Sequence, residues 1–155
     1  MSDRENTAQL SGQGYAPCMR LRLLETFDLR MFVMDWDYYH AKPDPTVGLT
    51  RLAALIKAAR GECLNGLLFD NGDFLQGNPP ADYIAEPPRN SGPHPLVTIM
   101  DGLDYDAVGL GNHEFNYGLD FLETALQGAP FPFLCANVVR ADGSAFLPPY
   151  AILNH

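Results

Sequence analysis

Short apolar segments of this chain alternate with longer segments in which apolar residues recur every three or four positions. The short segments predict buried strands at residues 20–27, 64–69, 107–110, 131–136 and 150–153. The longer segments predict helices between them, on the faces of the resulting sheet. Strands that alternate with helices over short connections favour a parallel sheet, so the pattern predicts an α/β fold with a mostly parallel sheet and flanking helices.

Three helices are predicted from the signals at their ends. Asp44-Pro45 offers a cap and a first-turn proline for a helix that ends at Gly61. Pro95 begins a second helix, and Asn116 caps a third that ends at Gly128. Residues 76–94 are dense in proline and glycine, which predicts a long surface loop.

Length and composition limit what the chain can be. With 155 residues, of which 46% are apolar, it can bury one core but not two. Residues 1–19 are polar and predict a flexible N-terminal tail with no signal peptide, so we expect a cytoplasmic location for the chain as given. The absence of a long apolar run argues against a membrane span. The three cysteines are widely spaced and suggest neither a disulfide framework nor a zinc site.

The net charge of −9 excludes one class of partner. A protein that binds DNA or RNA needs a basic surface to replace the counterions of the phosphate backbone, and this chain has none in its sequence. Acidic composition is compatible with a site that gathers carboxylates around cations, although solubility alone would also explain it.

Polar side chains follow each of the first three predicted strands. Asp28 follows the first strand, Asp73 the second, and Asn112 the third, within the run Gly111-Asn112-His113-Glu114. Right-handed crossovers place these strand ends on one edge of the sheet, where open α/β sheets bind ligands. Three oxygen donors on one edge indicate a candidate metal site. For the four-residue run alone, a polar turn that satisfies loose backbone groups remains the alternative.

The residues at these strand ends resemble a known family. Gly72-Asp73 and Gly111–Glu114 resemble the calcineurin-like metallophosphoesterases. The wider segments 68–77, 110–118 and 131–138 are similar to the bacterial 2′,3′-cyclic-nucleotide 2′-phosphodiesterase/3′-nucleotidases of the 5′-nucleotidase family. The resemblance implies that residues 20–155 form the N-terminal portion of an α/β/β/α sandwich, without the C-terminal half of the metallophosphoesterase domain and without the nucleotide-binding domain. Members of the family are usually periplasmic.

The resemblance also implies a chemistry. Asp28 matches the carboxylate of the first metal, Asp73 the carboxylate that bridges two metals, and Asn112 an amide ligand of the second. His113 matches the histidine that stabilises the transition state and can protonate the leaving oxygen. Two divalent ions (Mn, Zn, Fe, Co or Mg) would activate a hydroxide that attacks the phosphorus of a nucleotide or cyclic nucleotide. Glu114 is expected to orient its loop and is assigned no chemistry.

Two departures from the family open an alternative. The family has Asp-x-His at the first strand end, whereas this chain has Asp28-Leu29-Arg30, and an arginine cannot ligate a metal. Arg30 could pair with Asp28 and leave the first metal position empty or weak, clamp a phosphate, or simply lower metal affinity.

The second departure concerns the remaining histidines. His40 is expected in an exposed loop, His94 at a helix entry, and none matches the later histidine ligands of the family. The alternative function is therefore a catalytically inactive scaffold or interaction module with at most one weak metal site. An exposed sheet edge would then favour self-association.

Overall fold

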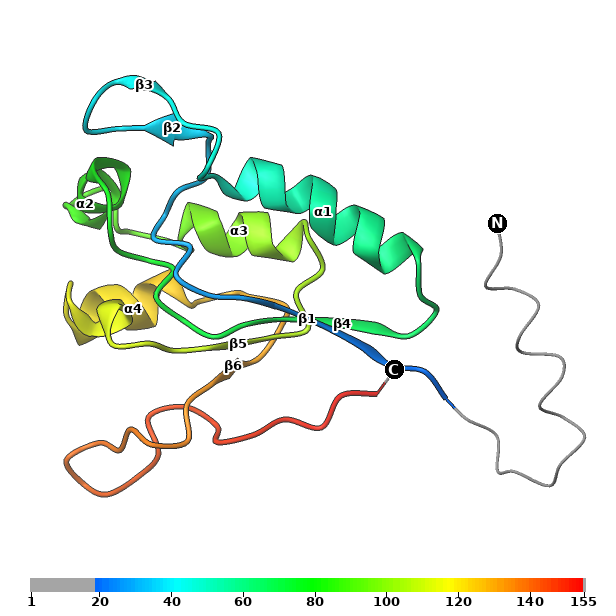
Figure 1. Ribbon diagram of the computed structural model, residues 1–155. Helices are drawn as coiled ribbons and strands as arrows, with labels where there is room; N and C mark the ends of the chain where they lie inside the picture. Colours follow the sequence, from blue (N-terminus) through cyan, green and yellow to red (C-terminus); the bar gives the residue numbers. More distant parts are fainter. Residues whose placement is uncertain (1–18, 155) are drawn as a thin grey trace, which may run out of the picture.

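The computed structural model describes residues 19–154, so the predicted N-terminal tail lies almost wholly outside the described residues. Four parallel strands form one sheet in the order β1-β4-β5-β6 (Figure 1). They are β1 (Arg22–Thr26), β4 (Gly66–Asp70), β5 (Ala107–Gly109) and β6 (Phe133–Leu134). Each lies within a segment predicted as a strand or one residue beyond it. The predicted α/β class with a mostly parallel sheet is confirmed.

Helices cover one face of this sheet. In Figure 1, α1 (Leu49–Gly61) and α3 (Pro95–Asp101) lie above the strands, while the chain after β6 runs below them. The shorter helices α2 (Pro79–Ala85) and α4 (Leu119–Ala125) and the 3-10 helix η2 (His113–Phe115) lie toward the end of the sheet where β1, β4 and β5 terminate. No helix of residues 19–154 is long and apolar enough to cross a membrane.

The two faces of β1 differ in how much apolar surface they bury. Leu24 and Thr26 point toward Leu52 and Ile56 of α1, as expected for alternate residues of a strand. Leu23, on the opposite face, is 62% exposed. The helix-covered face carries the core, in which Leu68 of β4 and Val108 of β5 are fully buried. The predicted self-association through an exposed edge is not tested by this arrangement and stays a prediction.

Two predicted helix starts are wrong. The helix expected from Asp44-Pro45 begins at Leu49, because residues 36–43 form a hairpin, β2 (Trp36–Asp37) with β3 (Lys42–Pro43). The Asp44 carboxylate instead accepts the backbone N–H of Thr46 at 2.8 Å, which closes a turn. At α4 the position before the helix is Gly118, with φ 89°, and not Asn116.

Two further predictions need correction. The predicted loop at 76–94 contains helix α2, which Asn78 caps by accepting the N–H of Ala81 at 3.1 Å. Pro79 stands at the first helical position, where its missing N–H costs nothing. Residues 150–153 form no strand, since they have no ladder partner within residues 19–154.

Candidate functional site at the carboxyl edge of the sheet

The turns after β1 and β4 are joined by their backbones. Asp28 and Arg30 donate their N–H groups to the carbonyls of Gly72 and Asp73, each at 3.0 Å. Met31 donates to the carbonyl of Phe74 at 2.9 Å. The predicted convergence of Asp28 and Asp73 on one edge is therefore confirmed.

The turns after β4 and β5 are joined by one side chain. The carboxylate of Glu114, which is fully buried, accepts four backbone N–H groups. Its Oε2 accepts those of Asp73 and Gly111, both at 2.7 Å, and its Oε1 accepts those of Phe74 at 2.7 Å and Leu75 at 3.1 Å. The expectation that Glu114 orients its loop is confirmed, because these bonds fix both turns.

Two glycines allow the turns to approach this closely. Gly72 has φ +96°, and a Cβ placed on it would lie 2.1 Å from the backbone nitrogen of Gly111. A Cβ on Gly111 would lie 2.2 Å from Oδ1 of Asp73. Any larger residue at either position would force the two turns apart.

Asp73 lies at the centre of the edge. Its Oδ1 accepts the backbone N–H of His113 at 3.0 Å, and its Oδ2 accepts an N–H of Arg30 at 3.2 Å. Asn112, one residue before His113, is exposed at the same turn. The structure thus brings Asp28, Asp73, Asn112 and His113 together at one edge.

The ring of His113 is oriented by a side chain that the sequence did not indicate. Nδ1 of His113 lies 2.6 Å from Oε1 of Gln76, which also accepts from Nδ2 of Asn116 at 2.8 Å. Nδ2 of Asn116 also lies 3.0 Å from Nδ1, so both neighbours contact this nitrogen, and Nε2 has no protein hydrogen bond among the described residues. Gln76 is 37 residues from His113 and 40 residues from Asn116 in the sequence, so only the fold reveals its role.

Arg30 pairs with both carboxylates of the edge. Its Nε donates to Oδ1 of Asp28 at 2.8 Å, and its Nη2 lies 2.6 Å from the same oxygen. The same Nη2 is 3.2 Å from Oδ2 of Asp73. Of the three open interpretations of Arg30, the structure shows the ion pair with Asp28.

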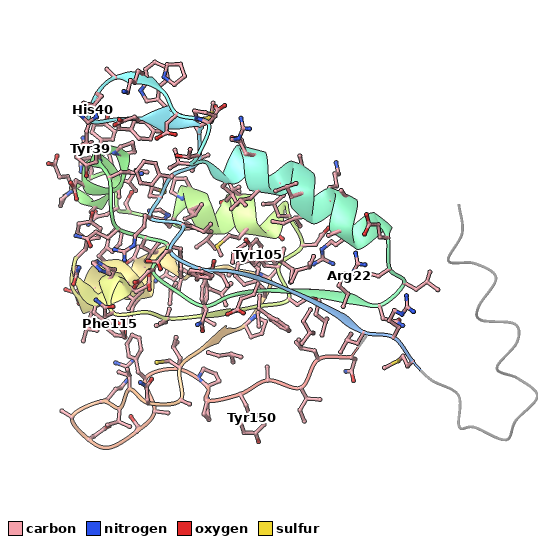
Figure 2. The ribbon with its side chains drawn as sticks, viewed as in Figure 1. Arg22, Tyr39, His40, Tyr105, Phe115 and Tyr150 are labelled. Atoms are coloured by element: carbon pink, nitrogen blue, oxygen red, sulfur yellow. The ribbon has the colours of Figure 1, made fainter. Side chains whose placement is uncertain are left out.

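The donors present do not fit two metal ions in this arrangement. Oxygens of both Asp28 and Asp73 are taken by Arg30. Within residues 19–154, no group of three or more His, Cys, Asp or Glu side chains could hold a metal. His40, at the outer end of the hairpin, pairs with Asp37 at 2.6 Å (Figure 2), and His94 is buried as the cap of α3. The expected positions of these two histidines are confirmed, and neither reaches the edge.

A buried acid lies behind the site. Asp70, 2% exposed, ends β4 and accepts the hydroxyl of Thr26 at 2.5 Å and the N–H of Gly72 at 2.9 Å. The Thr26 hydroxyl also lies 2.8 Å from that of Tyr105, inside the molecule (Figure 2). Burial raises the pKa of Asp70 to about 7 and that of Tyr105 to about 12, since desolvation disfavours both anions. Asp70 lies in segment 68–77, which carries the family resemblance, but the sequence analysis predicts no role for it.

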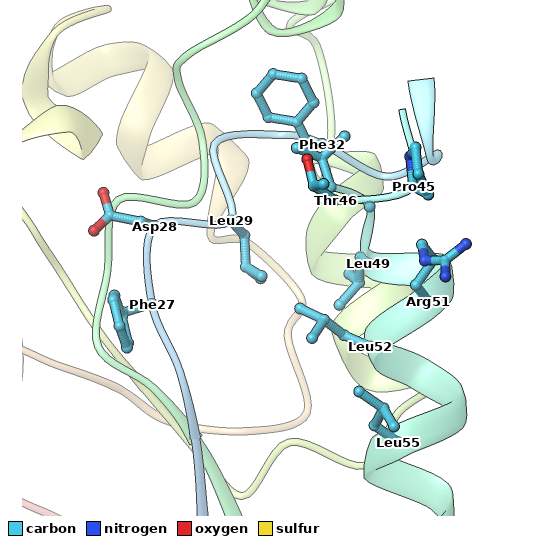
Figure 3. A pocket seen from close by; sticks show the side chains of 12 residues that line it. Phe27, Asp28, Leu29, Phe32, Pro45, Thr46, Leu49, Arg51, Leu52 and Leu55 are labelled. Atoms are coloured by element: carbon cyan, nitrogen blue, oxygen red, sulfur yellow. The ribbon is translucent and has the colours of Figure 1, made fainter. Parts of the chain in front are cut away.

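A cavity of about 340 Å³ adjoins the turn after β1 but is not the polar site. It lies between this turn and α1 (Figure 3), where the side chains of Leu29, Leu52 and Leu55 face its interior. The carboxylate of Asp28 and the guanidinium of Arg51 point away from it (Figure 3). The cavity is thus an apolar space, and the ionisable groups gather on the other side of the turn.

Comparisons with known proteins agree with this geometry. No protein-family model matches the chain. It is 47% identical over 141 residues to a 2′,3′-cyclic-nucleotide 2′-phosphodiesterase/3′-nucleotidase of Yersinia enterocolitica, which covers 90% of this chain and 22% of the relative. It is 45% identical over 142 residues to the trifunctional nucleotide phosphoesterase protein YfkN of Bacillus subtilis, covering 88% of this chain and 10% of the relative. The chain thus spans about a fifth or less of the length of these relatives.

Solved structures show the same similarity. The crystal structure of the calcineurin-like phosphoesterase YfkN from Bacillus subtilis matches with a TM-score of 0.82 and 43% identity, over 87% of this chain and 42% of that one. A putative 5′-nucleotidase from Staphylococcus aureus matches with a TM-score of 0.69 and 32% identity, over 79% of this chain and 24% of that one. The resemblance that the strand-end residues suggested is confirmed.

Proposed function

Because this chain belongs to the calcineurin-like phosphoesterases, we propose that it forms part of the catalytic site of a nucleotide phosphoesterase, and that its substrates are 2′,3′-cyclic nucleotides and 3′-nucleotides. The relatives named above are nucleotide phosphoesterases by description. The observation that carries the proposal is the hydrogen bond from the backbone N–H of His113 to Oδ1 of Asp73, which fixes the residue that bears the imidazole to the same edge as this carboxylate.

His113 is proposed as the catalytic residue. Gln76 holds Nδ1, so Nε2 is free to donate a hydrogen bond to a phosphoryl oxygen when the ring is protonated. As a water oxygen bonds to phosphorus and loses a proton to solvent, the bond between phosphorus and the leaving ribose oxygen breaks, and the proton on Nε2 passes to that leaving oxygen. The fixed ring orientation lowers the entropic cost of this transfer.

The family generally uses divalent metal ions, and metal binding by this chain is inferred from the family alone. A two-ion site at Asp28, Asp73 and Asn112 would require Arg30 to leave both carboxylates. The residues as arranged do not fit two ions, so the role of His113 is derived without them.

The test is hydrolysis of 2′,3′-cyclic AMP and of 3′-AMP in the presence of Mn²⁺, followed by chromatography of the products. We expect His113→Gln to lower kcat by about a hundredfold or more, the usual contribution of a general acid. His40→Gln is the matched control, since His40 is an exposed histidine of the hairpin, and it should leave kcat unchanged. Hydrolysis that is insensitive to His113→Gln would contradict the proposal.

A second candidate is a catalytically inactive scaffold or interaction module that retains at most one weak metal site and, we propose, still binds a nucleotide. The ion pairs of Arg30 with Asp28 and Asp73 favour it, because they neutralise the carboxylates that an ion would need. No turnover of either substrate, together with binding of 3′-AMP in a calorimetric titration, would favour this candidate over the enzyme.

A further inference from the structure

The guanidinium of Arg30 stands between two carboxylates that belong to different strand ends. It lies 2.6 Å from an oxygen of Asp28 and 3.2 Å from an oxygen of Asp73. One delocalised positive charge thus joins two negative ones, in a planar geometry that suits carboxylates. These are the two carboxylates that would have to share an ion at this edge.

Three features of the structure hold Arg30 in place. Its backbone has φ 50°, in the left-handed region, and its N–H donates to the carbonyl of Asp73 at 3.0 Å. Its carbonyl accepts Nδ2 of Asn78 at 2.9 Å, and Asn78 is 1% exposed. Its side-chain stem packs against Gly77, where a Cβ would lie 2.8 Å from Cβ of Arg30. The position of the guanidinium is therefore built into the fold and is not a chance surface contact.

We propose that the Arg30 guanidinium is the resident cation of this edge and excludes the divalent ion that Asp28 and Asp73 would otherwise bind together. A guanidinium offers hydrogen-bond donors and no lone pair, so it cannot share the carboxylate oxygens with a metal ion as a fellow ligand and competes with the ion for them. A divalent ion can enter only by displacing the guanidinium from both carboxylates. Its apparent affinity is lowered by the cost of that displacement.

This inference deepens the proposed function, because it concerns the same edge, but it is tested by ion binding and not by turnover. The experiment is calorimetric titration of the chain with Mn²⁺, for the original sequence and for Arg30→Met. Methionine keeps an unbranched stem against Gly77 and removes the charge. We expect Arg30→Met to bind Mn²⁺ at least about tenfold more tightly, because both carboxylates are freed.

Matched variants make the result specific. Arg51→Met removes an arginine that pairs with Asp35 at 3.6 Å, away from the edge, and should change the Mn²⁺ dissociation constant less than about twofold. Arg30→Lys keeps a cation at the position and should stay close to the original chain. Should Arg30→Met fail to fold, as judged by circular dichroism, Arg30→Gln replaces it with the same expectation.

Two results would overturn the inference. One is an Arg30→Met or Arg30→Gln variant whose affinity for Mn²⁺ rises less than about tenfold. The other is an original chain that already binds two Mn²⁺ ions as tightly as Arg30→Met does. Failure of hydrolysis would contradict the proposed function without affecting either outcome, so the two proposals can fail separately.

Discussion

Two carboxylates at the same edge of the sheet have opposite surroundings. Glu114 is fully buried, and all of its hydrogen bonds come from backbone N–H groups of the two neighbouring turns. The side chain of Asp28 is 50% exposed, and its partner is the guanidinium of Arg30. The first carboxylate is part of the fold, and the second is part of the surface that a ligand meets. Removal of the Glu114 carboxylate should therefore destabilise the fold strongly, whereas removal of the Asp28 charge should change the free energy of unfolding little.

Glu114→Ala should have the largest effect. It leaves four backbone N–H groups without their acceptor, and those of Phe74 and Leu75 are buried. Each buried unsatisfied group costs about 1–3 kcal/mol, so the free energy of unfolding should fall by about 4 kcal/mol. Urea denaturation measures it. Glu123→Ala, which removes an exposed partner of Arg140, is the control and should cost about 1 kcal/mol or less. A loss below about 2 kcal/mol for Glu114→Ala would break the comparison.

Gly72→Ala comes second, because it tests how closely the two turns approach. The new Cβ would lie 2.1 Å from the nitrogen of Gly111, in addition to the strain of φ +96°. We expect a loss of about 3 kcal/mol in urea denaturation. Gly143→Ala separates the two causes, since Gly143 has φ +85° with open space around its Cβ, and it should cost about 1 kcal/mol. Equal losses for the two variants would show that the close approach contributes nothing.

Asp70 is a third carboxyl group near this edge and is buried without a basic partner. Its raised pKa predicts that the free energy of unfolding depends on pH. Its folded pKa is raised to about 7, so its contribution to stability is full below its unfolded pKa and is lost as the pH rises from about 4 through about 7. Asp70→Asn cannot ionise, so its stability relative to the original chain should improve by about 4 kcal/mol over that range, which is about three pKa units at about 1.4 kcal/mol each.

His94 contributes to the pH dependence of stability with the opposite sign, and the comparison with Asp70→Asn cancels this contribution. Burial lowers the pKa of His94 to about 4, so stability due to neutral His94 is lost as the pH falls from about 6.5 toward about 4. Both chains contain His94, and the difference between their urea midpoints across the pH range therefore reports Asp70. A difference that does not change with pH would show that the pKa of Asp70 is not raised in the folded protein.

Asp28→Asn should have the smallest effect on stability. The ion pair that it breaks is half exposed, and such pairs contribute about 1 kcal/mol or less. Arg30 also keeps Asp73 as a partner. A loss above about 2 kcal/mol in urea would mean that Asp28 supports the fold as Glu114 does, and the contrast between the two carboxylates would disappear.

The sequence predicts the four strands of the sheet and the edge on which Asp28, Asp73 and Asn112 meet, because apolar runs and crossover handedness are local or general properties. It also predicts a strand at 150–153 that does not form, and it does not predict the hairpin of residues 36–43. It misplaces the helix starts for a physical reason. Asp44-Pro45 and Asn78-Pro79 carry the same signal, yet only the second opens a helix. Asp44 bonds to Thr46, two residues on, and closes a turn instead.

The parts of the site that could not be predicted depend on contacts between distant segments. Gln76 orients His113 only because the turn after β4 lies beside the one after β5. The pairing of Arg30 with Asp28 was one of three open interpretations, since the same guanidinium could equally have faced a phosphate. Its second contact, with Asp73, requires the parallel pairing of β1 and β4.

If Arg30 holds the place of an ion at this edge, its guanidinium should keep both carboxylates when Mn²⁺ is supplied. The most direct measurement is a crystal structure of the chain grown with Mn²⁺, with anomalous difference density calculated at the manganese absorption edge. We expect the guanidinium of Arg30 to stay between Asp28 and Asp73, with no manganese peak between these carboxylates. A manganese peak bonded to both carboxylates, with Arg30 turned away from them, would contradict it.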